Sequence, residues 1–398
     1  MHVFDPEILL TEKTALDPYP VFARMRALDP VHWNEPTNSW YVTTYGDVAR
    51  LLREESLSAC PGDYTGPQRD EDRPEVEEAM AFFNSWMVFS DPPHQTRLRE
   101  TVAPAFPRRS AEAWAGHVRR TARELLNAVG EGETDLFDAF AAPLAVRLTC
   151  AVLGVPEEDV RLVQDWSSRL IGFLSTPTAD PVRARIALRA RDDLRKYLQD
   201  TVIPGLRATD DERLIPLRGI AGLDPEDALA LFAQLLTGGI DPVASALATT
   251  ADVLLRWDPE ARAEALARPE LLEAVVEEAL RYDAPFHFVP RSTTVPLEVG
   301  GRTVPAGRRL VLVIASANRD EAVYEGPDAF RPGRGGPRHL SFGLGRHYCL
   351  GALLSRVILR EGVLALLERL DGTEARPLAA VRTPAFGVTT WQRLMVAV

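Results

Sequence analysis

Apolar residues recur at helical spacing along most of the chain, so the pattern predicts a mainly helical protein with a few strands. Residues 17–33 predict a short helix after a proline entry, and residues 39–54 predict a strand that runs into a helix. Pro92 and Pro93 open a further helix, and residues 271–282 form another. Residues 60–92 are rich in proline, glycine and acidic residues, which is typical of a long irregular loop over a binding site.

Most of the strand pattern lies in the last third of the chain. Residues 286–291 alternate as a strand does, and residues 295–320 predict a hairpin with its turn at Gly300 and Gly301. Residues 385–391 predict a final strand-like turn. A small sheet region beside a large helical body is the expected outcome.

The longest predicted helix runs from Asp224 to Arg256, with Asp224 as N-cap and Pro225 at the first position. Polar residues interrupt its apolar run, so it does not read as a membrane span. Its middle, Gly238-Gly239-Ile240-Asp241-Pro242, is inconsistent with a helix, since each glycine and the proline cost about 1 to 3 kcal/mol there. The proline ring predicts a kink in the helix. Residues that disfavour a helix, placed inside the longest helix, indicate a functional or strained site at this point.

Composition places the 398 residues among ordinary globular proteins, with 46% hydrophobic and 26% charged residues. We find no linker or repeat and therefore expect a single domain over residues 1–398. The first residues form neither a signal peptide nor a membrane anchor, and the net charge of −12 disfavours nucleic acid. We expect a monomeric cytoplasmic protein that binds neither nucleic acid nor membrane.

The strongest chemical signal is the run HLSFGLGRHYCLG at residues 339–351, with Cys349 near its end. Gly343 and Gly345 permit positive φ, and Gly351 lets a helix begin close by. The following apolar residues have helical spacing, so the Cys349 thiolate would lie at a helix N-terminus that stabilises it. A zinc site lacks partners, because Cys60 and Cys150 lie far away in sequence.

The full spacing of this run resembles the haem-binding loop of the cytochromes P450, in which the cysteine is the axial iron ligand. The resemblance implies the mainly α cytochrome P450 fold with a small β subdomain, haem b (iron protoporphyrin IX) as cofactor and Cys349 as metal ligand. One helix departs from the family, because Gln95 replaces its usual histidine and His94 stands beside it. The residues implied to contact the cofactor are Cys349, His347, Phe342, Gly343, Gly351, Arg99, Arg291 and His94.

Glu278 and Arg281 form a Glu-x-x-Arg pair on one helix face. By the same resemblance they join Arg334 in a buried network. Removal of one member of such a network would cost several kcal/mol.

The glycine-proline segment of the long helix resembles the family's oxygen-activation motif [AG]-G-x-[DE]-T. Gly238, Gly239 and Asp241 match it, and we take these three with Pro242 as the catalytic candidates. The threonine of the motif, which helps to deliver protons, is replaced by Pro242. Asp241 with ordered water, a substrate hydroxyl, or peroxide in place of dioxygen could compensate, in that order of preference, and Asp241 could instead only cap the kink.

Substrate contacts are expected from the aromatic loop, the long helix, the strand after Pro285 and the last turn. In that strand either Phe286, Phe288 and Pro290 or His287 and Val289 face the pocket, and we favour the second set. Segments 60–90 and 170–190 are expected to decide the substrate. The candidate substrate residues are Trp86, Val88, Thr237, Phe286, His287, Val289, Gly387 and Val388.

The function that the resemblance implies is a monooxygenase or oxidase of a hydrophobic or aromatic small molecule, in secondary metabolism, with ferredoxin and ferredoxin reductase as electron donors. The missing threonine keeps open a non-oxygenating catalyst of the same fold, for coupling, cyclisation or peroxide chemistry. A haem-binding module without catalysis is a further alternative. Arginines near the cysteine loop form either a docking face for an acidic electron carrier or ordinary solvated helix faces. They are Arg97, Arg99, Arg108, Arg109, Arg338, Arg346, Arg356 and Arg360.

Overall fold

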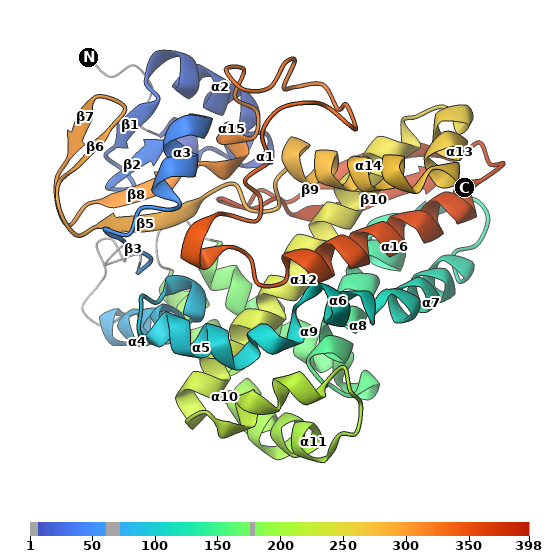
Figure 1. The fold of residues 1–398 in the computed structure, drawn as a ribbon, viewed down its shortest axis with the longest axis horizontal. Helices are drawn as coiled ribbons and strands as arrows, with labels where there is room; N and C mark the ends of the chain where they lie inside the picture. Colours follow the sequence, from blue (N-terminus) through green and yellow to red (C-terminus); the bar gives the residue numbers. More distant parts are fainter. Residues whose placement is uncertain (1–6, 61–71, 176–179, 398) are drawn as a thin grey trace.

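The computed structural model describes residues 7–60, 72–175 and 180–397. A large helical body fills most of the molecule, and a smaller sheet region lies at the side where the chain begins (Figure 1). The predicted mainly helical fold with a small β region is confirmed. The α-helices are α1 (Glu12–Leu16), α2 (Tyr19–Leu28), α3 (Tyr45–Leu51), α4 (Arg73–Asn84), α5 (His94–Val102), α6 (Arg108–Glu112), α7 (Ala115–Asn127), α8 (Ala142–Val152), α9 (Val160–Leu174), α10 (Pro181–Tyr197), α11 (Ile203–Ala208), α12 (Pro225–Leu255), α13 (Pro259–Ala267), α14 (Pro269–Tyr282), α15 (Ile314–Ala317) and α16 (Ala352–Leu370).

The strands of the described residues form three sheets. The largest has the order β1-β2-β8-β5-β3, with β2 and β8 parallel and the other pairs antiparallel. The second has the order β4-β10-β9, and β6 and β7 form the predicted hairpin with Gly300 and Gly301 at positive φ. The strands are β1 (Val31–Asn34), β2 (Ser39–Val42), β3 (Leu57–Ser58), β4 (Glu133–Asp135), β5 (Val289–Thr293), β6 (Leu297–Val299), β7 (Arg302–Val304), β8 (Arg309–Leu312), β9 (Arg376–Arg382) and β10 (Trp391–Ala397).

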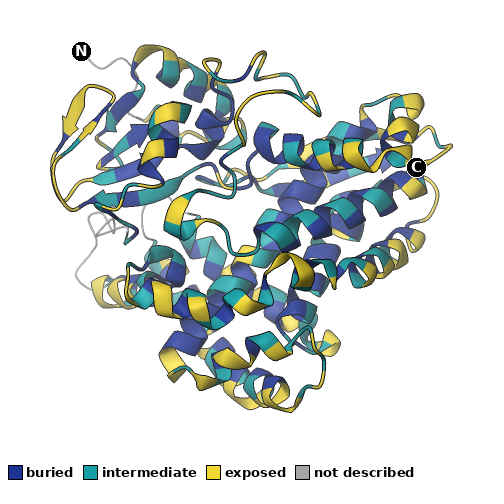
Figure 2. Ribbon diagram, viewed as in Figure 1, coloured by how far each residue is buried: buried dark blue, intermediate teal, exposed yellow. Residues whose placement is uncertain are grey.

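Two hydrophobic cores follow this division. One lies around α12 and α16, and the other lies between the five-stranded sheet and helices α2, α3 and α15. Exposed residues lie mainly on the outer faces of peripheral helices such as α10 and α13 (Figure 2). The two long helices therefore run through the helical core and can hold a site there rigidly.

Helix α12 begins as predicted, because the Asp224 side chain accepts hydrogen bonds from the N–H groups of Glu226 and Asp227. It continues through Pro242 to Leu255, so the proline does not end the helix. Among the described residues it is the one helix long and apolar enough to cross a membrane. Of its most apolar stretch, 67% is buried inside the protein, as in a core helix.

The prediction of one irregular loop over residues 60–92 is wrong in part. Helix α4 occupies Arg73–Asn84, and a 3₁₀ turn, η2, occupies Met87–Phe89. Val76, Met80 and Phe83 are buried, and their spacing places them on one face of α4. Residues 61–71, and residues 176–179 of the predicted specificity segment 170–190, lie outside the described residues.

Candidate functional site

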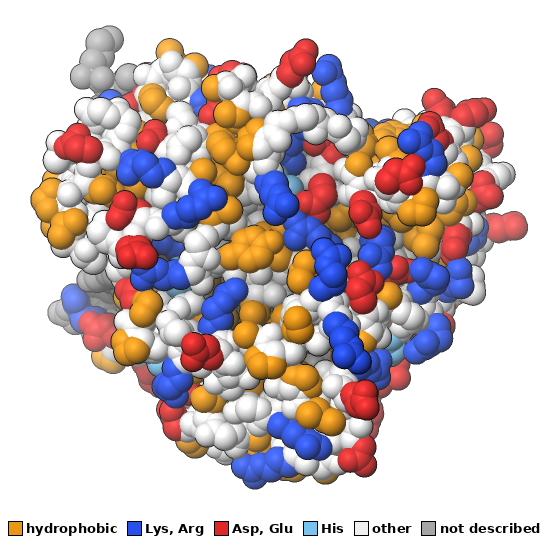
Figure 3. Space-filling model, in the orientation of Figure 1, with side chains coloured by type: hydrophobic (Ala, Val, Ile, Leu, Met, Phe, Trp, Pro, Cys, Tyr) orange, Lys and Arg blue, Asp and Glu red, His pale blue; other side chains and the backbone are white. Residues whose placement is uncertain are grey.

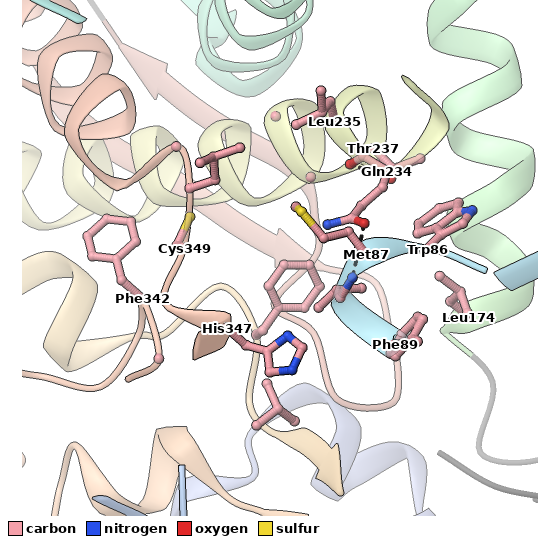
Figure 4. Close-up of a pocket in the computed structure, with 18 of the residues that line it drawn as sticks. Trp86, Met87, Phe89, Leu174, Gln234, Leu235, Thr237, Phe342, His347 and Cys349 are labelled. Carbon is pink, nitrogen blue, oxygen red and sulfur yellow. Dashed lines mark hydrogen bonds between the residues drawn. The ribbon is translucent and has the colours of Figure 1, made fainter. Parts of the chain in front are cut away.

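A cavity of about 390 Å³ lies between α12 and the loop that carries Cys349. Its wall includes the end of α4 with η2, the end of α9, the middle of α12, residues 286 and 288–291, residues 341–344 and 347–351, and the turn 386–388. Figure 4 shows Cys349 and Phe342 on one side of the cavity and Trp86 and Leu174 on the opposite side. The lining is largely apolar, which is typical of small-molecule sites.

Cys349 is held by the backbone of its own loop. Its N–H donates to the Phe342 carbonyl at 2.8 Å, and helix α16 begins three residues later, after the N-cap Gly351. Burial raises the pKa of the Cys349 thiol, while a hydrogen bond from the Gly351 backbone lowers it. The predicted placement of this sulfur beside a helix N-terminus is confirmed.

Two glycines give the loop its shape. Gly343 has φ +66° and Gly345 has φ +71°, values that favour glycine. A Cβ on Gly345 would lie 2.7 Å from the Leu52 carbonyl oxygen, so only glycine fits against the end of α3. The Phe342 ring lies under the Arg356 guanidinium at 4.4 Å, which fixes its position beside Cys349.

Two arginines and a histidine of the cavity wall, Arg291, Arg99 and His347, form no ion pair with a described residue. Arg291 is 6% exposed and donates to the carbonyl of Pro290 at 2.8 Å, and burial lowers its pKa to about 10. Burial, and next the neighbouring Arg291, lower the pKa of His347 to about 3. Arg99 lines the same cavity. The buried Arg291 guanidinium, with Arg99 as a second cation and the neutral His347 imidazole as a hydrogen-bonding group, fits a ligand that brings carboxylates of its own.

The geometry does not support the prediction that His94 contacts the cofactor. His94 does not line the cavity, and its Nε2 lies 2.8 Å from Asp227 Oδ1. Gln95 lines the cavity instead and is 2% exposed, with its Nε2 donating to the Arg346 carbonyl. Neighbouring positions on a helix point about 100° apart, so the hydrogen bond with Asp227 directs His94 away from the cavity.

Gly238 and Gly239 line the cavity from α12, as predicted. A Cβ on Gly239 would lie 2.7 Å from Thr149 Cγ2, so this glycine permits the close contact of α12 with α8. A Cβ on Gly238 would meet nothing within 4 Å and would occupy the cavity itself. Gly238 therefore keeps cavity space beside α12 free, and Gly239 lets α12 approach α8.

Asp241 and Pro242 are not among the described residues that line the cavity. Asp241 Oδ2 is buried without a hydrogen-bond partner among the described residues, and burial raises the pKa of this carboxyl from 3.8 to about 6. A carboxyl with this pKa can both hold and release a proton near neutral pH.

Seven of the eight candidate substrate residues line the cavity. They are Trp86, Val88, Thr237, Phe286, Val289, Gly387 and Val388. Thr237 uses its hydroxyl proton within α12, where it donates to the Ala233 carbonyl at 2.9 Å. The Trp86 indole nitrogen is buried with no hydrogen-bond partner among the described residues.

His287 does not line the cavity, so the geometry does not support its prediction as a substrate residue. Its Nε2 lies 3.0 Å from Thr389 Oγ1, and its ring packs against Tyr19 and Phe22 on the other side of the chain. Burial lowers its pKa to about 4. Phe288, assigned to the disfavoured set, does line the cavity.

The strand region and the last turn lie side by side at the cavity wall. The His287 N–H donates to the Gly387 carbonyl at 2.8 Å, and Phe286 pairs with Val388. Gly387 has φ +78°, and a Cβ there would lie 2.4 Å from Phe288 Cζ. The Phe288 ring therefore requires glycine at this position.

The predicted network behind the loop is present. Glu278 accepts from Arg281 Nε at 2.8 Å, from Arg334 Nε at 3.0 Å and from the Arg331 N–H at 2.7 Å. The Glu278 and Arg281 side chains are each 3% exposed. Charges buried this deeply are tolerated only when they are paired and hydrogen-bonded.

The eight arginines near the loop fall into three sets: those paired with carboxylates, one that lines the cavity, and those without a described ion-pair partner. Arg97, Arg356 and Arg360 pair with carboxylates, and Arg99 lines the cavity. The other four, Arg108, Arg109, Arg338 and Arg346, form no ion pair with a described residue, and the first three are exposed. Figure 3 shows basic side chains across the middle of the face that carries α16.

Gln234 lines the cavity from α12, although the sequence pattern marked it only as a polar interruption. Met87, Phe89, Phe288 and Leu174 also line it. Phe288 belonged to the alternative set of strand residues, whereas Met87, Phe89 and Leu174 carry no signal in the sequence that would separate them from core residues.

Comparison with known proteins agrees with this geometry. The family description "Cytochrome P450" matches residues 251–377. Cytochrome P450-SU2 of Streptomyces griseolus is 34% identical over 89% of this chain and 86% of its own length. Erythromycin C-12 hydroxylase of Saccharopolyspora erythraea is 32% identical over 87% of this chain and 86% of its own. The crystal structure of CalO2 superposes with a TM-score of 0.86 at 28% identity, and covers 100% of this chain and 99% of that one.

Proposed function

Because the chain belongs to the cytochrome P450 family and is therefore an oxidoreductase, we propose that it inserts oxygen into a largely hydrophobic or aromatic small molecule of secondary metabolism. The observation that supports this best is the Cys349 thiol at the wall of an apolar cavity of about 390 Å³. The named relatives, a cytochrome P450 and an erythromycin hydroxylase, agree with this class of reaction.

The residues present fit haem b, the cofactor of the family. Cys349 would supply a thiolate ligand to the iron, and the buried Arg291 with Arg99 and His347 would hold the two propionates. Gly343 and Gly351 line the cavity beside the cysteine without a Cβ that would obstruct a flat ring. When bound, haem supplies reductive dioxygen chemistry, in which one oxygen atom enters the substrate and the other leaves as water.

We propose that electrons arrive from a ferredoxin and its reductase at the face that carries α16. Arg108, Arg109, Arg338 and Arg346, which form no ion pair with a described residue, offer positive charge there to an acidic carrier. A cytoplasmic location suits such soluble partners.

We propose further that Asp241 carries protons in this chain, since proline stands at the position of the motif's threonine. Its buried carboxyl has no hydrogen-bond partner among the described residues, and its pKa is raised to about 6. Gly238, three residues before Asp241 on α12, leaves room in the cavity for water or for a substrate hydroxyl.

Two measurements test the proposed function. The reduced protein is expected to give the CO-bound absorption band of a thiolate-ligated haem, with one haem per chain. Turnover of a substrate panel is then compared with a ferredoxin system and with hydrogen peroxide. Oxygenated products with the ferredoxin system support the proposal, and absence of the thiolate band overturns it.

A second candidate function is supported by Pro242. A chain without the threonine hydroxyl could couple or cyclise its substrate without oxygen transfer, or could use peroxide. Products that contain no atom from ¹⁸O₂, or turnover with peroxide alone, would favour this candidate over the monooxygenase.

Asp241→Asn is expected to lower the yield of product per electron consumed roughly 100-fold, because an amide cannot hold and release the proton. The proton-carrying form of Asp241 decreases as pH rises through about 6, so wild-type product yield should fall between pH 6 and pH 8. The variant's residual yield should stay flat across this range. Measurement of product, hydrogen peroxide and electron consumption at each pH checks the prediction.

A second effect follows from the same raised pKa. The folded state favours the protonated carboxyl, so wild type should lose up to about 3 kcal/mol of stability relative to Asp241→Asn between pH 4 and pH 8. Asp252→Asn is the matched control on α12, because Asp252 pairs with Arg256 near the surface. Equal pH profiles for wild type and Asp241→Asn would contradict the proposed role.

A further inference from the structure

The Gln234 amide projects from α12 into the cavity. Its side chain extends toward Met87 and η2, on the side of α12 that faces Cys349 and Trp86 (Figure 4). Gln234 stands four residues before Gly238, which is about 6 Å along the helix axis. It therefore lies one helical turn from the glycine pair that keeps the cavity open.

One hydrogen bond fixes the orientation of this amide. The backbone N–H of Val88 donates to Gln234 Oε1 at 3.1 Å. Because an N–H must meet the oxygen of the amide and not its nitrogen, the NH₂ group faces the other way. Figure 4 shows the amide nitrogen on the side toward Cys349. No described residue accepts a hydrogen bond from this nitrogen.

The surrounding wall sets the chemistry of the ligand. The side chains near Gln234 are apolar or aromatic, among them Met87, Leu235, Phe89 and Leu174 (Figure 4). The described lining contains no aspartate or glutamate, so a cationic ligand would be buried without a counter-charge. Of the three arginines in the described lining, Arg99 and Arg291 lie near His347 at the cysteine side, where haem propionates would fit them, and Arg309 stands on β8 opposite Ser292, the residue after Arg291. A neutral ligand is what this wall accommodates.

We propose that the Gln234 NH₂ group donates a hydrogen bond to a carbonyl or ether oxygen of the substrate. The substrate is then a neutral, largely apolar molecule with at least one acceptor oxygen, held at that oxygen one helical turn from Gly238. The Val88 N–H makes this donor specific, since it prevents the amide from turning its oxygen to the ligand. This inference rests on the proposed function only in taking the cavity as the substrate site.

The test compares two probes that differ by one oxygen, 1-tetralone and tetralin, by calorimetric titration of the haem-loaded protein. Gln234→Met removes the donor and keeps a similar length. The ratio of the two dissociation constants is expected to shift against the ketone by roughly 3- to 10-fold in this variant, as for one neutral hydrogen bond. Gln164→Met, on α9 and outside the cavity lining, is the matched control and should leave the ratio unchanged.

An unchanged ratio in Gln234→Met, or an equal change in Gln164→Met, overturns the inference. Failure of wild type to bind 1-tetralone overturns it too, because the ketone belongs to the proposed ligand class. The CO-bound spectrum and tetralin binding of each variant verify that the cavity is folded. If the thiolate spectrum is present and the ratio of the two dissociation constants is unchanged in Gln234→Met, only the role of Gln234 is refuted. If wild type lacks the thiolate spectrum, the proposed function is refuted.

Discussion

Replacing Cys349 with serine is expected to abolish the thiolate-type CO spectrum and to lower oxygenation by more than about 100-fold. Loss of a residue that only hydrogen-bonds a metal ligand lowers activity by about 10- to 100-fold, and loss of the ligand itself should lower it further. The reason lies in the ligand atom. A serine hydroxyl keeps its proton at neutral pH and is a harder, weaker donor to iron than a thiolate. Absorption spectra of the reduced CO complex, haem content and product formation check this expectation.

The two other cysteines provide the control. Cys150 is buried in α8 and has no titrating neighbour that lowers its pKa, which burial raises to about 12. Cys150→Ala and Cys60→Ser should both keep the thiolate spectrum. Cys349→His should retain haem through an imidazole while losing the thiolate band. A thiolate spectrum that survives Cys349→Ser would contradict the assignment of the ligand.

The local parts of the site could be predicted from the sequence because their residues are contiguous. The loop from Phe342 to Gly351 contains its own turns, its own ligand and the start of its own helix, so its spacing specifies its geometry. Helix α12 likewise carries its N-cap at Asp224 within the sequence. In α4 the helical spacing of buried residues was also present, but proline and acidic residues nearby favoured a loop.

Contacts between distant segments were harder to predict. His94 and Gln95 are adjacent, and the choice between them depends on Asp227, which lies on another helix. The side of the chain that His287 faces depends on Thr389 and on the N-terminal helix α2, since β5 begins only at Val289. Gln234 was read only as a break in an apolar run, because the partner that orients it, the Val88 N–H, is 146 residues away.

Glu278→Gln is expected to destabilise the protein by about 3 to 5 kcal/mol and to release haem. The substitution removes the one carboxylate that Arg281 and Arg334 share, while Arg281 remains buried. Arg281 also donates to the Asn318 carbonyl at 2.8 Å, and the Asn318 side chain bonds Ser341 Oγ at 2.8 Å. Loss of the charge therefore loosens the segment that leads into the cysteine loop. Urea unfolding of the holoprotein and its haem-to-protein ratio measure both effects.

Glu277, the neighbouring residue on α14, is the control for the effect of burial, because its replacement also removes a paired glutamate. Glu277 binds Arg356 Nε at 2.6 Å and His339, but its side chain is 43% exposed. Water can replace an exposed partner, so Glu277→Gln should cost only about 0 to 1 kcal/mol and retain haem. Equal losses in the two variants would mean that burial does not decide the cost, and the account of the network as the support of the cysteine loop would then be wrong. Because the shared charge of Glu278 is buried, we expect the larger loss of unfolding free energy, together with haem release, in Glu278→Gln.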